Sequence, residues 1–160
     1  MPDTANNAEI DLDPARLSRR KNMVRVFYKD VWDKGDLSLM PELFHPSFTF
    51  RGSLGPALVG YDQFGDYVRW LTSVLEGYTS DILGLVEEGD TIAGKIRLHG
   101  IHRGPFFGHP ATGRRVSWHG APMFTFEGER IRDLWVLGDI HGLLRQLSGG
   151  ADPLDFRPSA

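Results

Sequence analysis

The feature that most constrains the fold is a change in the spacing of apolar residues near Gly77. Before this glycine, apolar side chains recur every three or four residues, which predicts helices from Pro14 to Gly35 and over 60–76. After it, apolar and polar residues alternate, which predicts strands over 79–88, 91–102, 115–127 and 130–138. Helices followed by an antiparallel meander indicate an α+β fold, with helices packed on one face of a curved sheet. This arrangement leaves a concave pocket, the usual form of a small-ligand site.

The remaining segments fit a single domain, which is the domain count that 160 residues suggest. The further elements are a short helix at 37–44, a strand at 47–51, a Gly- and Pro-rich loop at 103–114 and a closing helix at 140–147. Residues 1–13 and 149–160 lack periodicity and are predicted to be disordered tails. The domain is therefore expected to span 14–148.

The charge and the absence of cysteine exclude several kinds of site. Lys and Arg number 18 against 21 Asp and Glu, so the net charge is −3, and nucleic-acid binding is not expected. Without cysteine there is no thiol nucleophile, disulfide or Cys-ligated zinc, which fits a cytoplasmic protein. No apolar run approaches the roughly 20 residues that span a bilayer, and the first residues lack a signal-peptide core. Phosphate-loop, dinucleotide and His-Glu-x-x-His motifs are absent, so we expect neither a cofactor nor a metal.

Asp139 is the first candidate for chemistry. Alternation along the last strand places it on one face with Trp135 and Leu137. If that face looks inward, burial disfavours the charged carboxylate and suits the group to proton transfer. An aspartate directly before a short helix is also a favoured N-cap. The spacing supports both roles equally, and both could hold.

His102 is the second candidate, at the end of a predicted strand and on the same face as Ile96 and Leu98. There it could shuttle a proton or donate a hydrogen bond to a substrate carbonyl. The alternative is a structural histidine bonded to the backbone. Farther along, Trp118 and His119 are neighbours in a strand, so only one of them should face the pocket.

Four aromatic residues could form the walls of a substrate pocket: Tyr28, Trp32, Trp118 and Trp135. Tyr28 and Trp32 lie one helical turn apart and therefore share a face. Arg51 could bind an anionic or carbonyl group of the substrate. The alternative is that the aromatic residues belong to the core and that Arg51 is exposed or salt-bridged.

Three segments resemble the SnoaL-like polyketide cyclase family. They are the strand–loop–strand segment 100–120 (GIHRGPFFGHPATGRRVSWHG), the helix and turn running from Tyr28 and Trp32 to Gly35-Asp36, and the closing segment 134–147 (LWVLGDIHGLLRQL). The similarity covers about 25–147. It implies the cone-shaped α+β roll of the nuclear transport factor 2-like superfamily, which also includes ketosteroid isomerase.

The resemblance also implies an activity. Characterised members close a ring of an aromatic polyketide by intramolecular aldol condensation without a cofactor, and an aspartate of the last strand, here Asp139, serves as acid and base. Members tend to form dimers or tetramers through their sheets. We therefore expect a lyase or isomerase that binds a small apolar or cyclic carbonyl compound. Two alternatives stay open: a non-catalytic binding protein of the same fold, and a hydrolase that opens a strained ring such as an epoxide.

Overall fold

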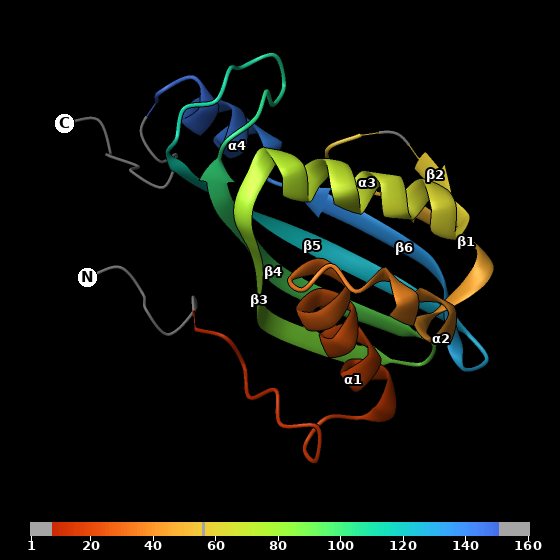
Figure 1. Ribbon diagram of the computed structural model, residues 1–160. Helices are drawn as coiled ribbons and strands as arrows, with labels where there is room; N and C mark the ends of the chain where they lie inside the picture. The colour runs from red at the N-terminus through yellow and green to blue at the C-terminus, as the bar shows by residue number, and fades with distance from the viewer. Residues whose placement is uncertain (1–7, 56, 151–160) are drawn as a thin grey trace.

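A single six-stranded sheet forms the backbone of the fold, and helices cover one of its faces (Figure 1). The computed structural model describes residues 8–55 and 57–150. The strands are β1 (Phe44–Arg51), β2 (Ala57–Val59), β3 (Leu75–Glu88), β4 (Thr91–His102), β5 (Arg115–Glu127) and β6 (Arg130–Gly138). Their order is β2-β1-β6-β5-β4-β3, in which only the β1–β6 pair is parallel. This mixed, curved sheet with helices on one face confirms the predicted α+β fold.

The predicted first helix is shorter and less regular than its spacing suggests. The helices are α1 (Arg19–Val26), the π-helix η2 (Phe27–Trp32), the 3-10 turn η3 (Leu37–Leu39), α2 (Met40–Leu43), α3 (Gly60–Val74) and α4 (Ile140–Leu147). The first one starts at Arg19 because the Ser18 hydroxyl accepts the backbone N–H of Lys21 at 3.1 Å, whereas Pro14 lies in a turn. It then widens into η2, and π-helical turns are frequent at functional sites.

Strand β3 begins four residues before its predicted start, directly after α3. The reason is pairing with β4: Leu75 lies opposite His102, and Glu76 lies opposite Ile101. The carbonyl of Val74, the last residue of α3, also accepts the backbone N–H of Arg103 at 2.9 Å. These contacts end the helix and attach the long loop after β4 to it.

The core is an aromatic cluster between the helices and the sheet, with Phe64 of α3 at its centre. The Phe64 side chain is fully buried. Its ring contacts six other aromatic rings: Phe27, Trp32, Phe44, Phe48, Phe50 and Tyr67. These rings come from η2, β1 and α3, so the cluster joins the helical layer to the sheet.

The N-terminal residues of the described part lie along β3. The Ile10 N–H donates to the Ile82 carbonyl at 2.9 Å, and the Ile82 N–H donates to Glu9 Oε2 at 3.0 Å. Ile10 and Leu12 pack against the core. The sequence predicted disorder over 1–13, and the structure instead places 9–12 on the sheet. Residues 1–7 and 151–160 of the two predicted tails lie outside the described residues.

Within the described residues, every helix is too short or too polar to cross a bilayer. The longest of them, α3, has 15 residues.

Candidate functional site

An apolar cavity lies between the helices and the inner face of the sheet. It has a volume of about 40 Å³ and is lined by Phe27, Tyr28, Trp32, Phe50, Gly52, Ser53, Leu54, Tyr67, Leu71, Tyr78, Leu98, Trp118, Leu134 and Val136. A volume of this size holds about three water molecules, whereas ligand pockets usually measure about 300–1,000 Å³. An organic ligand therefore enters only if side chains of the wall move apart.

Three of the predicted pocket residues do line this cavity. Tyr28 and Trp32 reach it from η2, and Trp118 reaches it from β5. All three side chains are buried. Of the neighbours Trp118 and His119, the tryptophan is therefore the one that faces the cavity, and His119 belongs to the opposite face of the sheet.

Trp135 and Arg51 lie outside the cavity lining, so they do not join the other predicted pocket residues there. Trp135 is 39% exposed, and its neighbours Leu134 and Val136 line the cavity instead. The pairing of β5 with β6 shifts register between Thr125 and Phe126, and this irregularity reverses the alternation beyond Ile131. The Arg51 guanidinium lies over the Trp135 ring, 5.6 Å from its centroid, and donates to the Val136 carbonyl at 3.1 Å.

The same shift moves Asp139 away from the predicted inward face. Its side chain is exposed and does not line the cavity. Asp139 Oδ1 accepts the Gly142 N–H at 3.0 Å, so the residue is the N-cap of α4, as one of the two sequence interpretations proposed. The preceding Gly138 packs closely against Ser53, which lines the cavity. The Asp139 carboxylate therefore caps α4 and is not part of the cavity lining.

His102 is fully buried but also lies outside the cavity lining. Its Nδ1 accepts the Thr112 N–H at 3.3 Å and is 3.1 Å from the Thr112 hydroxyl. Nδ1 is thus the acceptor, which places the proton of the neutral ring on Nε2. Nε2 has no hydrogen-bond partner among the described residues. These contacts attach the 103–114 loop to the end of β4, which agrees with the structural alternative for His102.

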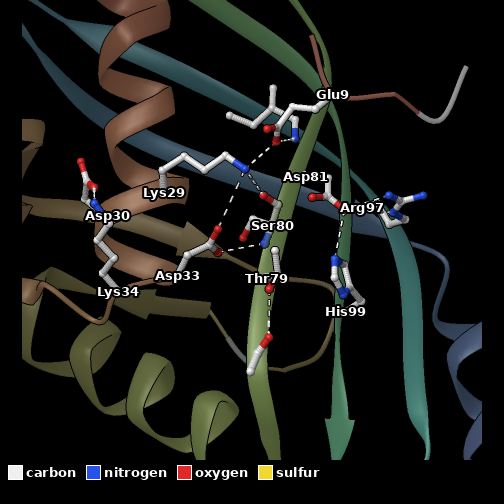
Figure 2. Close-up of polar contacts among 12 residues, drawn as sticks. Glu9, Lys29, Asp30, Asp33, Lys34, Thr79, Ser80, Asp81, Arg97 and His99 are labelled. Carbon is white, nitrogen blue, oxygen red and sulfur yellow. Dashed lines mark hydrogen bonds and ion pairs between the residues drawn. The ribbon is translucent and has the colours of Figure 1, made fainter. Parts of the chain in front are cut away.

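Asp33 is a polar residue near the cavity that the sequence did not indicate. It lines a surface groove that shares Trp32 and Tyr78 with the cavity wall. Asp33 follows the last residue of η2, and its side chain is 17% exposed. Asp33 Oδ1 accepts the Ser80 N–H at 2.8 Å, and Lys29 Nζ lies 4.0 Å from Oδ2 (Figure 2). Burial raises the pKa of Asp33 to about 6, although Ser80 and Lys29 favour the ionised form.

Ser80 and Tyr78 connect this carboxylate with the cavity. Both side chains are buried on the inner face of β3, two residues apart. Burial raises the pKa of Tyr78 well above its ordinary value, and the Ser80 hydroxyl lowers the pKa of both Tyr78 and Asp33. A carboxylate at a helix end beside Lys29 is typical of an exposed position, so the sequence carries no signal that Asp33 is buried.

The outer face of the sheet carries a second polar cluster, also visible in Figure 2. Asp81 Oδ2 accepts from Arg97 Nη2 at 2.9 Å and lies 3.0 Å from His99 Nε2. His99 therefore lies on the outer face, opposite to the buried His102. Within the described residues, no group of three or more His, Asp or Glu side chains could hold a metal ion.

Comparison of the sequence with known proteins identifies a family and two similar enzymes. A family model described as SnoaL-like polyketide cyclase matches residues 22–147. Aklanonic acid methyl ester cyclase DnrD of Streptomyces peucetius is 30% identical over 122 residues, which cover 74% of this chain and 83% of the relative. Aklanonic acid methyl ester cyclase DauD of Streptomyces sp. (strain C5) is 35% identical over 122 residues, covering 74% of this chain and 75% of the relative.

Solved structures show the same architecture. A putative polyketide cyclase from Acidithiobacillus ferrooxidans superimposes with a TM-score of 0.74 at 25% identity, covering 85% of this chain and 99% of that one. TsrD from Streptomyces laurentii superimposes with a TM-score of 0.72 at 27% identity, covering 86% of this chain and 98% of that one.

Proposed function

The chain belongs to the SnoaL-like polyketide cyclase family, and on that premise we propose that it is a cofactor-free cyclase acting on a polyketide-like carbonyl compound. The observation that carries the proposal is the apolar cavity between the helices and the sheet, whose lining includes seven aromatic side chains. Flat aromatic walls suit a flat, conjugated substrate. A cavity that holds two reacting carbons together supplies much of the rate of an intramolecular condensation.

The cavity also offers hydrogen-bond donors for a carbonyl oxygen. Tyr28, Tyr67 and Tyr78 line it, and burial raises the pKa of each phenol well above the ordinary value. The three phenols thus stay protonated at neutral pH and can donate to an oxygen that becomes negative during the reaction. No Asp or Arg is among the described residues that line the cavity, so no observation favours the ring-opening hydrolase.

Asp139 is the proposed base that takes a proton from the substrate carbon next to a carbonyl. The role is supported by the family match over the closing segment and by the place of Asp139 directly after β6, whose Leu134 and Val136 line the cavity. His102 lies behind the lining and is proposed to act by orienting the wall around Trp118. The Phe106 ring lies next to both, 6.2 Å from the His102 ring and 6.5 Å from the Trp118 ring.

The first prediction separates catalysis from capping at Asp139. With aklanonic acid methyl ester as substrate, we expect Asp139→Asn to lower turnover about 100-fold while the melting temperature stays unchanged, because asparagine is also a good N-cap. Asp139→Ala should in addition lose about 1 kcal/mol of stability. Asp66→Asn, an exposed carboxylate on α3 paired with Arg69, is the matched control and should keep full turnover.

The two parts of the proposal fail in different ways. Full turnover by Asp139→Asn would leave Asp139 as a cap only. A wild-type protein that binds aromatic polyketides but cyclises none of them would be a non-catalytic binding protein of this fold.

We also propose that the protein associates through the outer face of its sheet. Met123, Trp135 and Leu137 are 45%, 39% and 56% exposed there, and Met123 lies opposite Trp135 in the β5–β6 pair. Adjacent exposed apolar side chains of this kind mark interaction surfaces. We expect sedimentation to show a dimer or tetramer for the wild type and a monomer for Leu137→Lys. Ser73→Lys, which adds the same charge on the exposed side of α3, is the control and should keep the wild-type state. A monomeric wild type would contradict this proposal.

A further inference from the structure

We propose that Tyr78, Ser80 and Asp33 form a proton path from solvent to the cavity, and that Tyr78 protonates the alkoxide that ring closure produces. The inference rests on the proposed cyclase function and extends it to the acid side of the reaction. Tyr78 would be a catalytic residue, and Ser80 and Asp33 would act through it.

Tyr78 stands between the cavity and a groove on the surface. With Trp32 it lines both spaces, and the two rings pack at a centroid distance of 5.1 Å. Asp33, Lys34 and Gly35 line the groove on its outer side. A single layer of aromatic side chains therefore separates Asp33 and solvent from the cavity interior.

Ser80 lies between the two titratable groups. Its N–H donates to Asp33 Oδ1 at 2.8 Å, while its buried hydroxyl has no hydrogen bond of standard geometry among the described residues. The same hydroxyl lies on the inner face of β3 together with the Tyr78 side chain, on the residue whose N–H binds Asp33. A buried hydroxyl without a partner is costly and is kept where it has a use, which here is to pass a proton in either direction.

The charges around Asp33 leave its carboxyl free to exchange a proton near neutral pH. Lys29 is the nearest cation, but its Nζ donates to the Ser80 carbonyl at 2.6 Å and to Glu9 Oε2 at 2.5 Å (Figure 2). Glu9 thus neutralises much of the charge that Lys29 would otherwise offer to Asp33. Asp81, on the same strand as Ser80, adds a negative charge that favours the protonated carboxyl.

The proposed step balances without a cofactor. The substrate alkoxide takes the Tyr78 phenolic proton, the Tyr78 oxygen takes the Ser80 hydroxyl proton, and the Ser80 oxygen takes the proton of the neutral Asp33 carboxyl. Asp33 then regains a proton from water in the groove. The proton that the base removes from carbon returns to solvent, so the net reaction consumes none.

The test combines kinetics with a titration that does not depend on turnover. With aklanonic acid methyl ester, we expect Tyr78→Phe to lower kcat about 100-fold, and Asp33→Asn to lower kcat at pH 6 about tenfold with little change in KM. The wild-type kcat should decline as the pH rises through about 6, and this decline should be absent in Asp33→Asn. Asp30→Asn is the matched control, a carboxylate of the same helix that pairs with Lys34 at 2.9 Å.

The titration uses carboxyl-carbon NMR of Asp33 in the wild type and in Ser80→Ala. Loss of the hydroxyl should raise the Asp33 midpoint, and Ser73→Ala, an exposed serine of α3, should leave it unchanged. An Asp33 midpoint that is the same in Ser80→Ala would overturn the path whether or not the protein turns over this substrate. An active wild type whose pH profile survives in Asp33→Asn would also overturn it, while the cyclase proposal would stand. A wild type without turnover would count against the cyclase proposal alone, since the NMR result still decides whether the path exists.

Discussion

Replacing Phe64 with alanine is expected to lower the free energy of unfolding by about 3–5 kcal/mol, which is the range for deleting a buried phenylalanine. The ring is fully buried and contacts six other aromatic rings from the helices and β1. Its loss leaves a cavity whose stiff walls cannot collapse to fill it. Urea denaturation should show the loss as a lower midpoint with an unchanged slope.

Two further variants make this measurement specific. Phe64→Leu keeps most of the volume and should cost less than about 1.5 kcal/mol. Val86→Ala removes an exposed side chain and should change stability by no more than about 0.5 kcal/mol. A cost below about 1 kcal/mol for Phe64→Ala would contradict the central role of the aromatic cluster. Since Phe64 contacts Trp32 and Phe50, both part of the cavity wall, the variant should also weaken ligand binding.

The sheet shows which parts of the fold a sequence specifies locally. The predicted bounds of β4, β5 and β6 agree with the structure because turn residues mark the strand ends, and each hairpin has a glycine with positive φ in its turn, Gly89 and Gly128. The start of β3 could not be predicted in the same way. Leu75 continues the apolar spacing of α3, and only pairing with His102 makes it extended.

Which residues of β6 face the cavity could not be predicted from alternation. Residues 134–137 are all apolar, so the sequence does not indicate which of them face inward. The register shift between β5 and β6 decides it, placing Leu134 and Val136 inside and Trp135 outside. Asp139 follows this phase and becomes an exposed cap. By contrast, Tyr28 and Trp32 were predictable because helical spacing places them on one apolar face, which η2 preserves.

Asp33 was missed for a related reason. Nothing near it in the chain is unusual, because its burial comes from β3, and its partner Ser80 is 47 residues away. A contact over this distance is invisible to local spacing. The group with the clearest acid–base character in the structure therefore came from tertiary packing rather than from a motif.

Removing the carboxyl of Asp33 is expected to make the protein more stable at neutral pH. Its pKa rises from 3.8 to about 6 on folding, so the folded state binds the proton more tightly than the unfolded state. The stability that this proton contributes is fully present below pH 3.8 and is lost as the pH rises to about 6. The difference between these two pKa values corresponds to at most about 3 kcal/mol.

Urea denaturation of the wild type and Asp33→Asn at pH 4 and pH 7.5 measures this contribution, because all other titrating groups cancel in the difference. We expect the free energy of unfolding of Asp33→Asn, relative to that of the wild type, to be about 2–3 kcal/mol higher at pH 7.5 than at pH 4. Asp30→Asn is the control, a carboxylate of the same helix that pairs with Lys34 at 2.9 Å, and should show no such change. A difference that does not vary with pH would mean that Asp33 is not strained by burial. If Asp33→Asn is inactive and less stable than the wild type, the loss of activity is a folding defect. If it is inactive but more stable, the Asp33 carboxyl is needed for proton transfer although it lowers stability.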